Sequence, residues 1–365
     1  MAPDFVKSRF RSLPSTLLPI VTGVILCIVF ASATQSAADA KAGTLRIYFV
    51  DVEGGQSTLF VTPSGQSLLI DTGWPGHNGR DADRIVAAAK DAGIKKIDYV
   101  LITHFHEDHV GGVPQLVERI PVGTFIDHGV NRQTTDAPTV ADYQAYRKVL
   151  ATGKYKHITP KPGDHLPIKG IQTTVVSADG ALIDNPLPGG GMENPSCKDA
   201  ESYPADKTEN ARSLGTLITF GKLRILDLGD LTHDKEVQLM CPINKLGKLD
   251  IYIVSHHGWS QSSSPALVYG IDSRVAIMDN GAKKGGTPSV IDIIKKSPHL
   301  EDLWQLHFSE EGGAEHNTAA EFIANLSDSP DPGNYLELTA HKNGSFDVFN
   351  SRTQKTKHYP AEKSR

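Results

Sequence analysis

The chain has 365 residues, of which 39% are hydrophobic and 22% charged, enough material for one large α/β domain or two smaller ones. Its formal net charge is -5, and because residues 1–40 contribute +1, residues 41–365 carry -6. A mildly acidic chain with no basic stripe interleaved with aromatic residues is poorly suited to neutralise several phosphates, so we expect no tight nucleic-acid binding.

The first forty residues differ in composition from the rest. Basic residues at positions 7, 9 and 11 precede an apolar run at 17–30, and small residues follow up to position 40. This order is typical of a secretory signal peptide, and Pro19 and Gly23 leave the run short of the roughly 20 apolar residues that a spanning helix needs. We predict a signal peptide over residues 1–40, export to the periplasm or the extracellular space, and no stable membrane span after cleavage. An uncleaved membrane anchor is the alternative.

Alternating apolar and polar residues predict a strand meander at the start of the remaining chain, followed by helices and strands in turn. The turn at 63–66 contains proline and glycine, and Gly93 suits the end of a helix. The expected strands are 44–52, 57–62, 67–70, 97–103 and 122–127, and the expected helices are 81–92 and 113–119.

The second half repeats strands and helices around a long irregular segment. Residues 185–207 are rich in proline, glycine and acids, and a loop of that length is usually functional or pinned by a disulfide. Asn343-Gly344 lies between two alternating runs and predicts a hairpin. The expected strands are 173–176, 214–220, 223–228, 249–255, 274–278, 303–307, 336–339 and 346–349, and the expected helices are 141–151 and 289–295.

Two cysteines remain after removal of a signal peptide, which would take Cys27 with it. Cys197 and Cys241 each stand near a proline in loop-like sequence. In an oxidising compartment a disulfide between them can persist. The alternative is two separate small apolar side chains.

Three histidines and two acids stand within six positions, His104-Phe105-His106-Glu107-Asp108-His109, on the loop after the strand at 97–103. His104 and His106, two apart on extended backbone, project the same way and can share one ion. Asp108 and His109, past the bend, point at a second place close by. Imidazole nitrogen with carboxylate oxygen suits zinc first, with manganese or iron possible, and such a first shell fits a hydrolytic site. We predict one or two Zn²⁺ ions here.

The segment Thr-His-Phe-His-Glu-Asp-His-Val-Gly-Gly at 103–112 resembles the His-x-His-x-Asp-His signature of the metallo-β-lactamase-fold hydrolases. The resemblance implies an α/β fold, a four-layer αββα sandwich, with a one- or two-metal site at one end of the paired sheets. We expect this domain to span residues 41–325, with a C-terminal β extension at 326–365 packed on the same domain.

Two further strand ends carry candidate residues. In the resembling family a Gly-Asp after a strand supplies a carboxylate that bridges the two metals, and Gly229-Asp230 matches it; a turn-forming aspartate is the alternative. His256 and His257 also follow a strand, and adjacent side chains at a strand tip face opposite ways, so we expect at most one of them to reach a given metal. The other could donate a hydrogen bond or a proton to the substrate, unless both are core histidines.

The His-His-Gly segment at 256–258, with Phe49-Val50-Asp51-Val52-Glu53-Gly54-Gly55-Gln56 and Asn210-Ala211-Arg212-Ser213-Leu214, resembles a narrower branch of the superfamily. This branch holds the metallo-β-lactamase-like domain of bacterial DNA-uptake channel proteins and the secreted phosphorylcholine esterases. The resemblance covers roughly residues 44–290, and only the short motifs are specific.

The chain departs from that branch at two histidines. Members carry Gly-His-Pro where this chain has Gly286-Thr287-Pro288, so a ligand of the second metal is missing from its expected position. His307 and His316 are the candidate substitutes. The family's histidine between the first cluster and Asp230 has no evident match either, and His128, at a strand end, is our candidate metal ligand for that role. Where members carry Gly-Gln-Gly in the first motif, this chain has Glu53-Gly54-Gly55, which places an extra acid near the mouth of the site.

We therefore predict an exported metal-dependent hydrolase, in which Asp108 and Asp230 hold the ions and a water, and His256 or His257 steadies the leaving group. Phosphate esters are the first choice because the most similar branch acts on phosphodiesters, and a small molecule or head group is the expected substrate. The alternatives are amide, thioester or lactone hydrolysis on the same metal frame, or a metal-binding module with a decayed second site and no turnover. The sequence identifies no partner protein.

Overall fold

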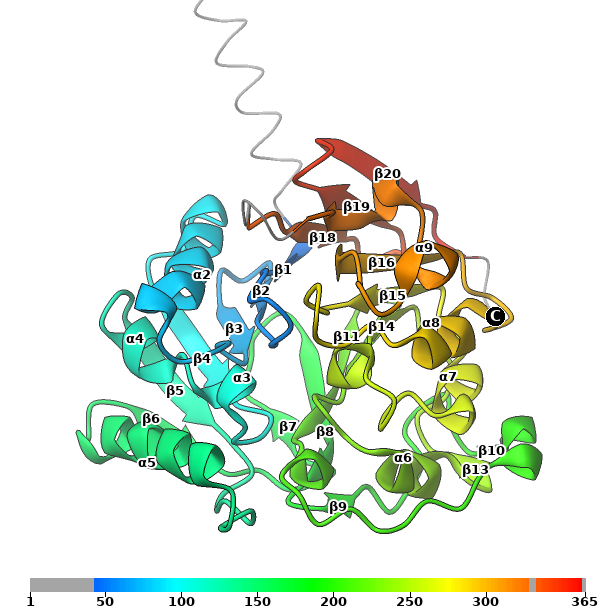
Figure 1. Ribbon diagram of the computed structural model, residues 1–365, viewed down its shortest axis with the longest axis horizontal. Coiled ribbons are helices and arrows are strands. Elements are labelled where there is room, and N and C mark those ends of the chain that lie inside the picture. Colours follow the sequence, from blue (N-terminus) through cyan, green and yellow to red (C-terminus); the bar gives the residue numbers. More distant parts are fainter. Residues whose placement is uncertain (1–42, 328–332, 363–365) are drawn as a thin grey trace, which may run out of the picture. The chain divides into compact units, whose positions relative to one another are not determined.

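Two nine-stranded sheets form the middle of the computed structural model, which describes residues 43–327 and 333–362 (Figure 1). The predicted signal peptide at residues 1–40 lies outside the described residues. Within the described ranges, no helix combines the length and the apolar character that crossing a membrane requires.

The first sheet joins the N-terminal meander to the C-terminal strands. In spatial order it contains β20 (Lys355–Tyr359), β19 (Phe346–Asn350), β18 (Leu336–Ala340), β1 (Leu45–Phe49), β2 (Thr58–Val61), β3 (Ser67–Ile70), β4 (Ile97–Leu101), β5 (Val122–Ile126) and β6 (Lys156–Ile158). Strands β1 to β3 pair antiparallel, whereas β3 to β6 run parallel. The C-terminal strands extend the sheet along β1, with Leu338 opposite Ile47.

The second sheet has the same division into an antiparallel and a parallel half. In spatial order it contains β17 (Ile323–Asn325), β16 (Asp302–His307), β15 (Val275–Met278), β14 (Ile251–Ile253), β12 (Leu223–Asp227), β11 (Gly215–Phe220), β8 (Gln172–Ala178) and β7 (His165–Leu166), with β9 (Ala181–Leu182) paired to β8. Strands β7, β8, β11 and β12 pair antiparallel, and β12 to β17 pair parallel in the order given. A small separate sheet pairs β10 (Met192–Glu193) with β13 (Ile243–Asn244).

Helices cover the outer face of each sheet (Figure 1). Those on the first sheet are α2 (Arg80–Asp91), α3 (Glu107–Val110), α4 (Val113–Val117) and α5 (Ala137–Ala151); those on the second are α6 (His233–Met240), α7 (Pro265–Ile271), α8 (Pro288–Lys295) and α9 (Gly313–His316). Short 3₁₀ turns are η1 (His77–Gly79), η2 (Pro195–Asp199), η3 (Asn210–Arg212), η4 (Ser255–Gly258) and η5 (Ala320–Phe322). Helix α5 begins four residues before the predicted 141, because Asp136 accepts a hydrogen bond from Thr139 N and caps it.

Strand alternation divides the apolar residues into three cores. Ile47 and Phe49 join the core between the two sheets, while Tyr48 between them packs into the core under the helices of the first sheet. In the second sheet Ile251 faces the central core and Tyr252 the outer helices. Three cores between four layers make an αββα sandwich, which confirms the predicted fold class.

A disulfide joins Cys197 in η2 to Cys241, directly after α6, with their Cα atoms 5.7 Å apart. This confirms the predicted pairing. It ties the start of the long segment before η3 to the helical layer of the second sheet.

The two halves meet where β4, β12 and β14 end. Thr103 O, after β4, accepts a hydrogen bond from Leu214 N, and Gly229 O, after β12, accepts one from His256 N, after β14. Because backbone bonds join the strand ends, the loops that follow them are held against one another.

Candidate metal centre

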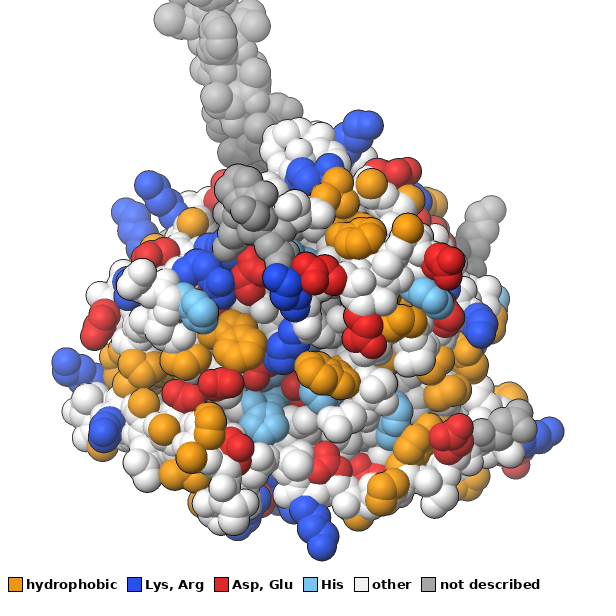
Figure 2. All heavy atoms as spheres, in the orientation of Figure 1, with side chains coloured by type: hydrophobic (Ala, Val, Ile, Leu, Met, Phe, Trp, Pro, Cys, Tyr) orange, Lys and Arg blue, Asp and Glu red, His pale blue; other side chains and the backbone are white. Residues whose placement is uncertain are grey.

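Histidine and acidic side chains gather near the centre of the face shown in Figure 2, among apolar and basic ones. A cavity of about 360 Å³ opens here, and its lining includes His106, Asp108, Asp230, His256 and Lys284. These residues come from the loops after β4, β12, β14 and β15. The carboxyl ends of parallel strands are the usual place for ligand sites in open α/β sheets.

Four buried side chains form a first group that could hold a metal ion: Asp108, His109, Asp230 and His257. His109 Nε2 lies 3.4 Å from Asp108 Oδ2 and 3.3 Å from Asp230 Oδ2. His257 Nε2 lies 3.2 Å from Asp108 Oδ2. One ligand atom from each of the four side chains lies within 4.8 Å of the others, close enough to surround one cation.

A second group shares one member with the first. It consists of His104, His106 and Asp230. His104 Nε2 lies 3.0 Å from His106 Nδ1 and 3.7 Å from Asp230 Oδ2. Asp230 therefore stands between two candidate sites, in the position of a carboxylate that could bridge two ions.

The hydrogen bonds of these histidines are compatible with bound cations, because they leave ring nitrogens facing inward. His109 Nδ1 donates to Asp71 Oδ2 at 2.7 Å, so Nε2 is the ring nitrogen that faces His257 Nε2, 3.2 Å away. His106 Nε2 donates to Gln133 Oε1, so Nδ1 presents its lone pair to His104 Nε2. Converging imidazole nitrogens repel unless a proton or a metal ion lies between them.

Both aspartates carry charge at this site. Burial raises the pKa of Asp230, but His109, His256 and His257 oppose it and hold that pKa well below its usual value. For Asp108, burial is likewise outweighed by Lys284 and His109, so its pKa is also low. Asp230 Oδ1 is buried without a hydrogen-bond partner, which is costly for a carboxylate unless a cation contacts it.

A buried turn fixes the position of Asp230. Asp227 Oδ1 accepts a hydrogen bond from Gly229 N, and Ser213 Oγ accepts one from Asp230 N. Gly229 has φ +54°, and a Cβ there would lie 2.8 Å from the Thr103 side chain. Only glycine lets the two loops approach so closely.

Of His256 and His257, only His257 belongs to one of the two groups. Both have left-handed backbone, φ 56° and 54°, in the turn η4. As a result both rings reach Asp230: His256 Nε2 lies 3.3 Å from Oδ2 and His257 Nε2 lies 3.5 Å from Oδ1. The rule that adjacent side chains face opposite ways holds on a strand, and β14 has already ended at Ile253.

His128 is not part of either group, which corrects its prediction as a metal ligand. Its Nε2 donates to Glu209 Oε2 at 2.9 Å, and its ring packs on Phe105 at 4.6 Å between centroids. Glu209 also accepts hydrogen bonds from the backbone N–H of Arg132 and Phe105. His128 follows β5 at the same edge of the sheet as the two groups, but its side chain hydrogen-bonds the buried carboxylate of Glu209 instead.

His307 and His316 also lie outside the two groups. His316 Nδ1 contacts Asp292 at 2.8 Å, and His307 Nε2 contacts Asp51 Oδ1 at 2.8 Å. Asp51, Glu53 and His307 form a third group of possible ligands, but Arg84 Nη1 lies 3.1 Å from Asp51 and supplies a cation already.

Lys284 lies in the loop after β15, three residues before Thr287, the position at which the branch carries a histidine. Its ammonium contacts Asp108 Oδ2 and lies 4.8 Å from the centre of the Trp74 ring. Lys284 is the only lysine or arginine among the described residues that line the cavity of the metal centre.

Sequence reasoning missed the residues that orient the ligands, among them Asp71, Gln133 and Asp227. Asp71 follows β3 directly, and its position at a strand end beside β4 was a usable signal. Gln133 lies in an irregular segment between β5 and α5, where no local pattern indicates what it contacts.

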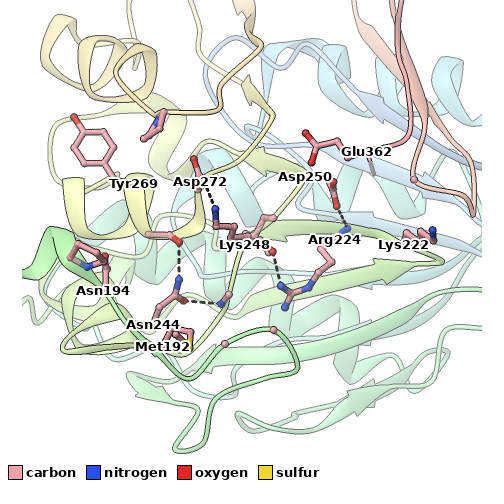
Figure 3. Close-up of a pocket in the computed structure, with 18 of the residues that line it drawn as sticks. Met192, Asn194, Lys222, Arg224, Asn244, Lys248, Asp250, Tyr269, Asp272 and Glu362 are labelled. Atoms are coloured by element: carbon pink, nitrogen blue, oxygen red, sulfur yellow. Dashed lines mark hydrogen bonds and ion pairs between the residues drawn. The ribbon is translucent and has the colours of Figure 1, made fainter. Parts of the chain in front are cut away.

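Another cavity lies at the opposite ends of β12 and β14. It has about 690 Å³, and its lining includes Arg224, Lys248 and Asp272 (Figure 3). Arg224 donates to the carbonyls of Lys248 and Leu246, and Lys248 donates to Asp272. None of the groups of possible metal ligands found among the described residues lies in this cavity.

An αββα sandwich with a histidine and aspartate cluster at one end of its sheets defines the class of metallo-β-lactamase-fold proteins. Residues 51–192 match the model of the metallo-beta-lactamase superfamily. The match covers less than half of the 365 residues, and the fold of the chain is the metallo-β-lactamase fold.

Individual relatives are distant. ComE operon protein 3 of Bacillus subtilis is 25% identical over 278 residues, 72% of this chain and 31% of that protein. Atrochrysone carboxyl ACP thioesterase of Emericella nidulans is 30% identical over 129 residues, 33% of this chain and 38% of that protein. The metallo-beta-lactamase fold protein YhfI of Bacillus subtilis has a TM-score of 0.43 at 13% identity, covering 72% of this chain and 95% of that one. The chain spans less than half the length of the curated relatives it matches.

Proposed function

We propose that this protein is a metal-dependent hydrolase of phosphodiesters, working through two divalent cations that share Asp230. The observation that carries the proposal is the pair of ligand groups with Asp230 in common. His104 and His106 would hold one ion, and Asp108, His109 and His257 the other, with zinc as the first choice and manganese or iron possible.

The bound ions would supply Lewis acidity, which makes water a nucleophile near neutral pH and stabilises charge on the ester oxygens. The protein's own residues complete the site. Asp71 and Gln133 accept hydrogen bonds from His109 Nδ1 and His106 Nε2, which directs the other nitrogen of each ring inward. Lys284 presents a positive charge in the same cavity, which favours an anionic substrate group.

His256 is suited to handle a proton. Burial lowers its pKa to about 4, so the imidazole is neutral near pH 7. Its Nδ1 contacts Ser262 Oγ at 3.2 Å, and Nε2 lies at the rim of the cavity beside Asp230. A neutral imidazole held in this way can accept a proton from water or return one to a leaving alcohol.

Thioester hydrolysis is the second candidate, because relatives named as thioesterases match 31% and 33% of the chain. Phosphodiesters come first for two reasons. The DNA-uptake relatives match more of the chain, 65% and 72%. Lys284 adds a cation that an uncharged thioester does not require.

The test is hydrolysis of bis-p-nitrophenyl phosphate beside a thioester substrate, together with metal analysis. His104→Ala should lose one ion and at least a hundredfold in kcat/KM. His358→Ala is the matched control, since this histidine is exposed and pairs only with Asp347. Activity and metal content unchanged in His104→Ala would overturn the proposal, and hydrolysis of the thioester alone would favour the second candidate. A folded protein that binds metal and turns over neither substrate would indicate a binding module.

Export remains part of the proposal. The Cys197–Cys241 disulfide fits an oxidising compartment, and the order of basic, apolar and small residues at the N-terminus supports a signal peptide. Detection of the protein in the periplasmic or medium fraction, with its N-terminus near residue 41, would test it.

A further inference from the structure

A second cavity, of about 600 Å³, lies beside the metal centre. Its floor comes from Thr232, His233 and Asp234, which follow Asp230, and from Ser260 to Ser262, which follow Trp259. Gln261 lines both this cavity and the one over the metal centre. A substrate held at the ions can therefore extend one arm past Gln261 into the second cavity.

One side of this second cavity comes from the segment between the disulfide and η3. It consists of residues 201–206, and the Cys197–Cys241 disulfide lies just before it. At its end Asp206 accepts hydrogen bonds from the backbone N–H and the hydroxyl of Thr208. The Tyr203 ring packs on the His233 ring at 4.4 Å between centroids. This ring contact keeps Tyr203 beside His233 in the lining of the cavity.

The lining offers hydrogen-bond acceptors and no cation. Three carboxylates, Glu201, Asp206 and Asp234, line the cavity, and none of the described lining residues is lysine or arginine. His233 Nε2 donates to Ser262 O, and burial lowers the pKa of His233, so its Nδ1 is an acceptor near neutral pH. An anionic group would be repelled here, whereas hydroxyl or amine groups would find partners.

The remaining wall is apolar. Pro265, Val290 and Ile293 from α7 and α8 face the segment that carries Tyr203. The carboxylate of Glu201 and the hydroxyl of Tyr203 make no hydrogen bond within the described part of the chain. A ring or an aliphatic frame that carries donors would match both kinds of wall, and about 600 Å³ is ample for a group far larger than methyl.

We propose that this second cavity, lined by Glu201, Tyr203, His233 and Gln261, binds one organic arm of the substrate, and that this arm is non-anionic and rich in hydrogen-bond donors. This inference rests on the proposed phosphodiester hydrolysis, because it places the phosphate at the ions and the arm past Gln261. A hydroxylated arm, such as a nucleoside, and an ammonium-bearing arm share the required chemistry.

The test compares p-nitrophenyl phosphodiesters that differ only in the second ester group: methyl, 5′-thymidyl, 2-aminoethyl and 2-carboxyethyl. We expect at least one donor-bearing arm to raise kcat/KM about tenfold over methyl, mainly through a lower KM, and the carboxyethyl arm to give no gain. Glu201→Gln and Tyr203→Ala should each reduce, severalfold, the ratio of kcat/KM for the favoured arm to kcat/KM for methyl. Glu193→Gln, a change at an exposed acid outside this cavity, should keep it.

A direct binding measurement separates this inference from the proposed function. Saturation-transfer NMR with thymidine and with ethanolamine reports on the cavity without turnover, and the signal of the favoured arm should fall in both cavity variants and persist in Glu193→Gln. Phosphodiester hydrolysis without any preference among the arms would overturn the cavity assignment and leave the proposed function standing. Binding of an arm by a protein that hydrolyses no phosphodiester would overturn the function instead. A preference for the carboxyethyl arm would also refute the inference.

Discussion

Gln133 gives the sharpest prediction about the metal centre, because its side-chain oxygen holds a ligand of only one of the two groups. Gln133 Oε1 accepts hydrogen bonds from His106 Nε2 at 3.1 Å and from Glu209 N at 2.9 Å. The bond from the backbone N–H identifies this atom as the oxygen. Replacing Gln133 with leucine removes the acceptor and leaves His106 free to rotate or to change tautomer.

The size of the effect follows from what such partners contribute. Loss of a hydrogen-bond partner behind a ligating histidine typically weakens metal binding by about 10- to 100-fold, or about 1.4–2.7 kcal/mol. His106 belongs to the group with His104 and Asp230, and not to the group with His109 and His257. Gln133→Leu should therefore weaken the binding of one ion by this factor. The dissociation constant of the other ion should change by less than about twofold.

The assay is a competitive chelator titration of Zn²⁺ that resolves two dissociation constants. Gln133→Glu keeps an acceptor oxygen and should keep the affinity. Gln115→Leu is the control of matched size, since Gln115 donates to Gly76 O on the surface, away from the ligands. Unchanged affinities in Gln133→Leu, or an equal loss at both sites, would refute the assignment of His106 to a separate site.

Three further predictions concern charge, pH and the disulfide. Lys284→Ala should raise the KM for bis-p-nitrophenyl phosphate about tenfold in steady-state kinetics, with partial recovery in Lys284→Arg; an unchanged KM would exclude contact with the substrate. Burial raises the pKa of Glu236 to about 7 from its ordinary 4.5, so the folded chain keeps a proton that the unfolded chain releases. The free energy of unfolding should thus fall by about 3 kcal/mol between pH 4.5 and 7, and urea unfolding of Glu236→Gln should lack this component; equal slopes would contradict it. Cys197→Ser, which opens a link between residues 44 apart, should cost about 4 kcal/mol of unfolding free energy, and no change in urea midpoint would argue against this pairing.

The fold could be predicted because most of its helices and strands follow from local sequence patterns. The meander, the alternating helices and strands, and the hairpin at Asn343-Gly344 each follow from alternation and turn residues, and β1 to β5 match the predicted strands within a few residues. Short elements without such a pattern, including β6, β13 and α6, were not predicted. They exist because neighbouring strands and helices pair or pack with them.

The candidate site was predictable where ligands follow one another along the chain, and less so where they meet through tertiary contacts. The motifs single out His104, His106, Asp108, His109 and Asp230, and the structure brings these side chains together in the two candidate groups. His128 was misassigned because its position at a strand end is local, whereas its partner Glu209 is 81 residues away. The joint approach of His256 and His257 depends on left-handed backbone at both residues, which their side chains do not reveal.

Metal analysis of Asp230→Ala beside the wild-type protein tests the central claim most directly. The folded wild-type chain should hold two divalent ions. The variant lacks the carboxylate that both groups share, so it should lose both ions or bind them much more weakly. Circular dichroism should show that the variant is still folded. Two ions retained in folded Asp230→Ala, or a wild-type chain that binds none, would contradict the account.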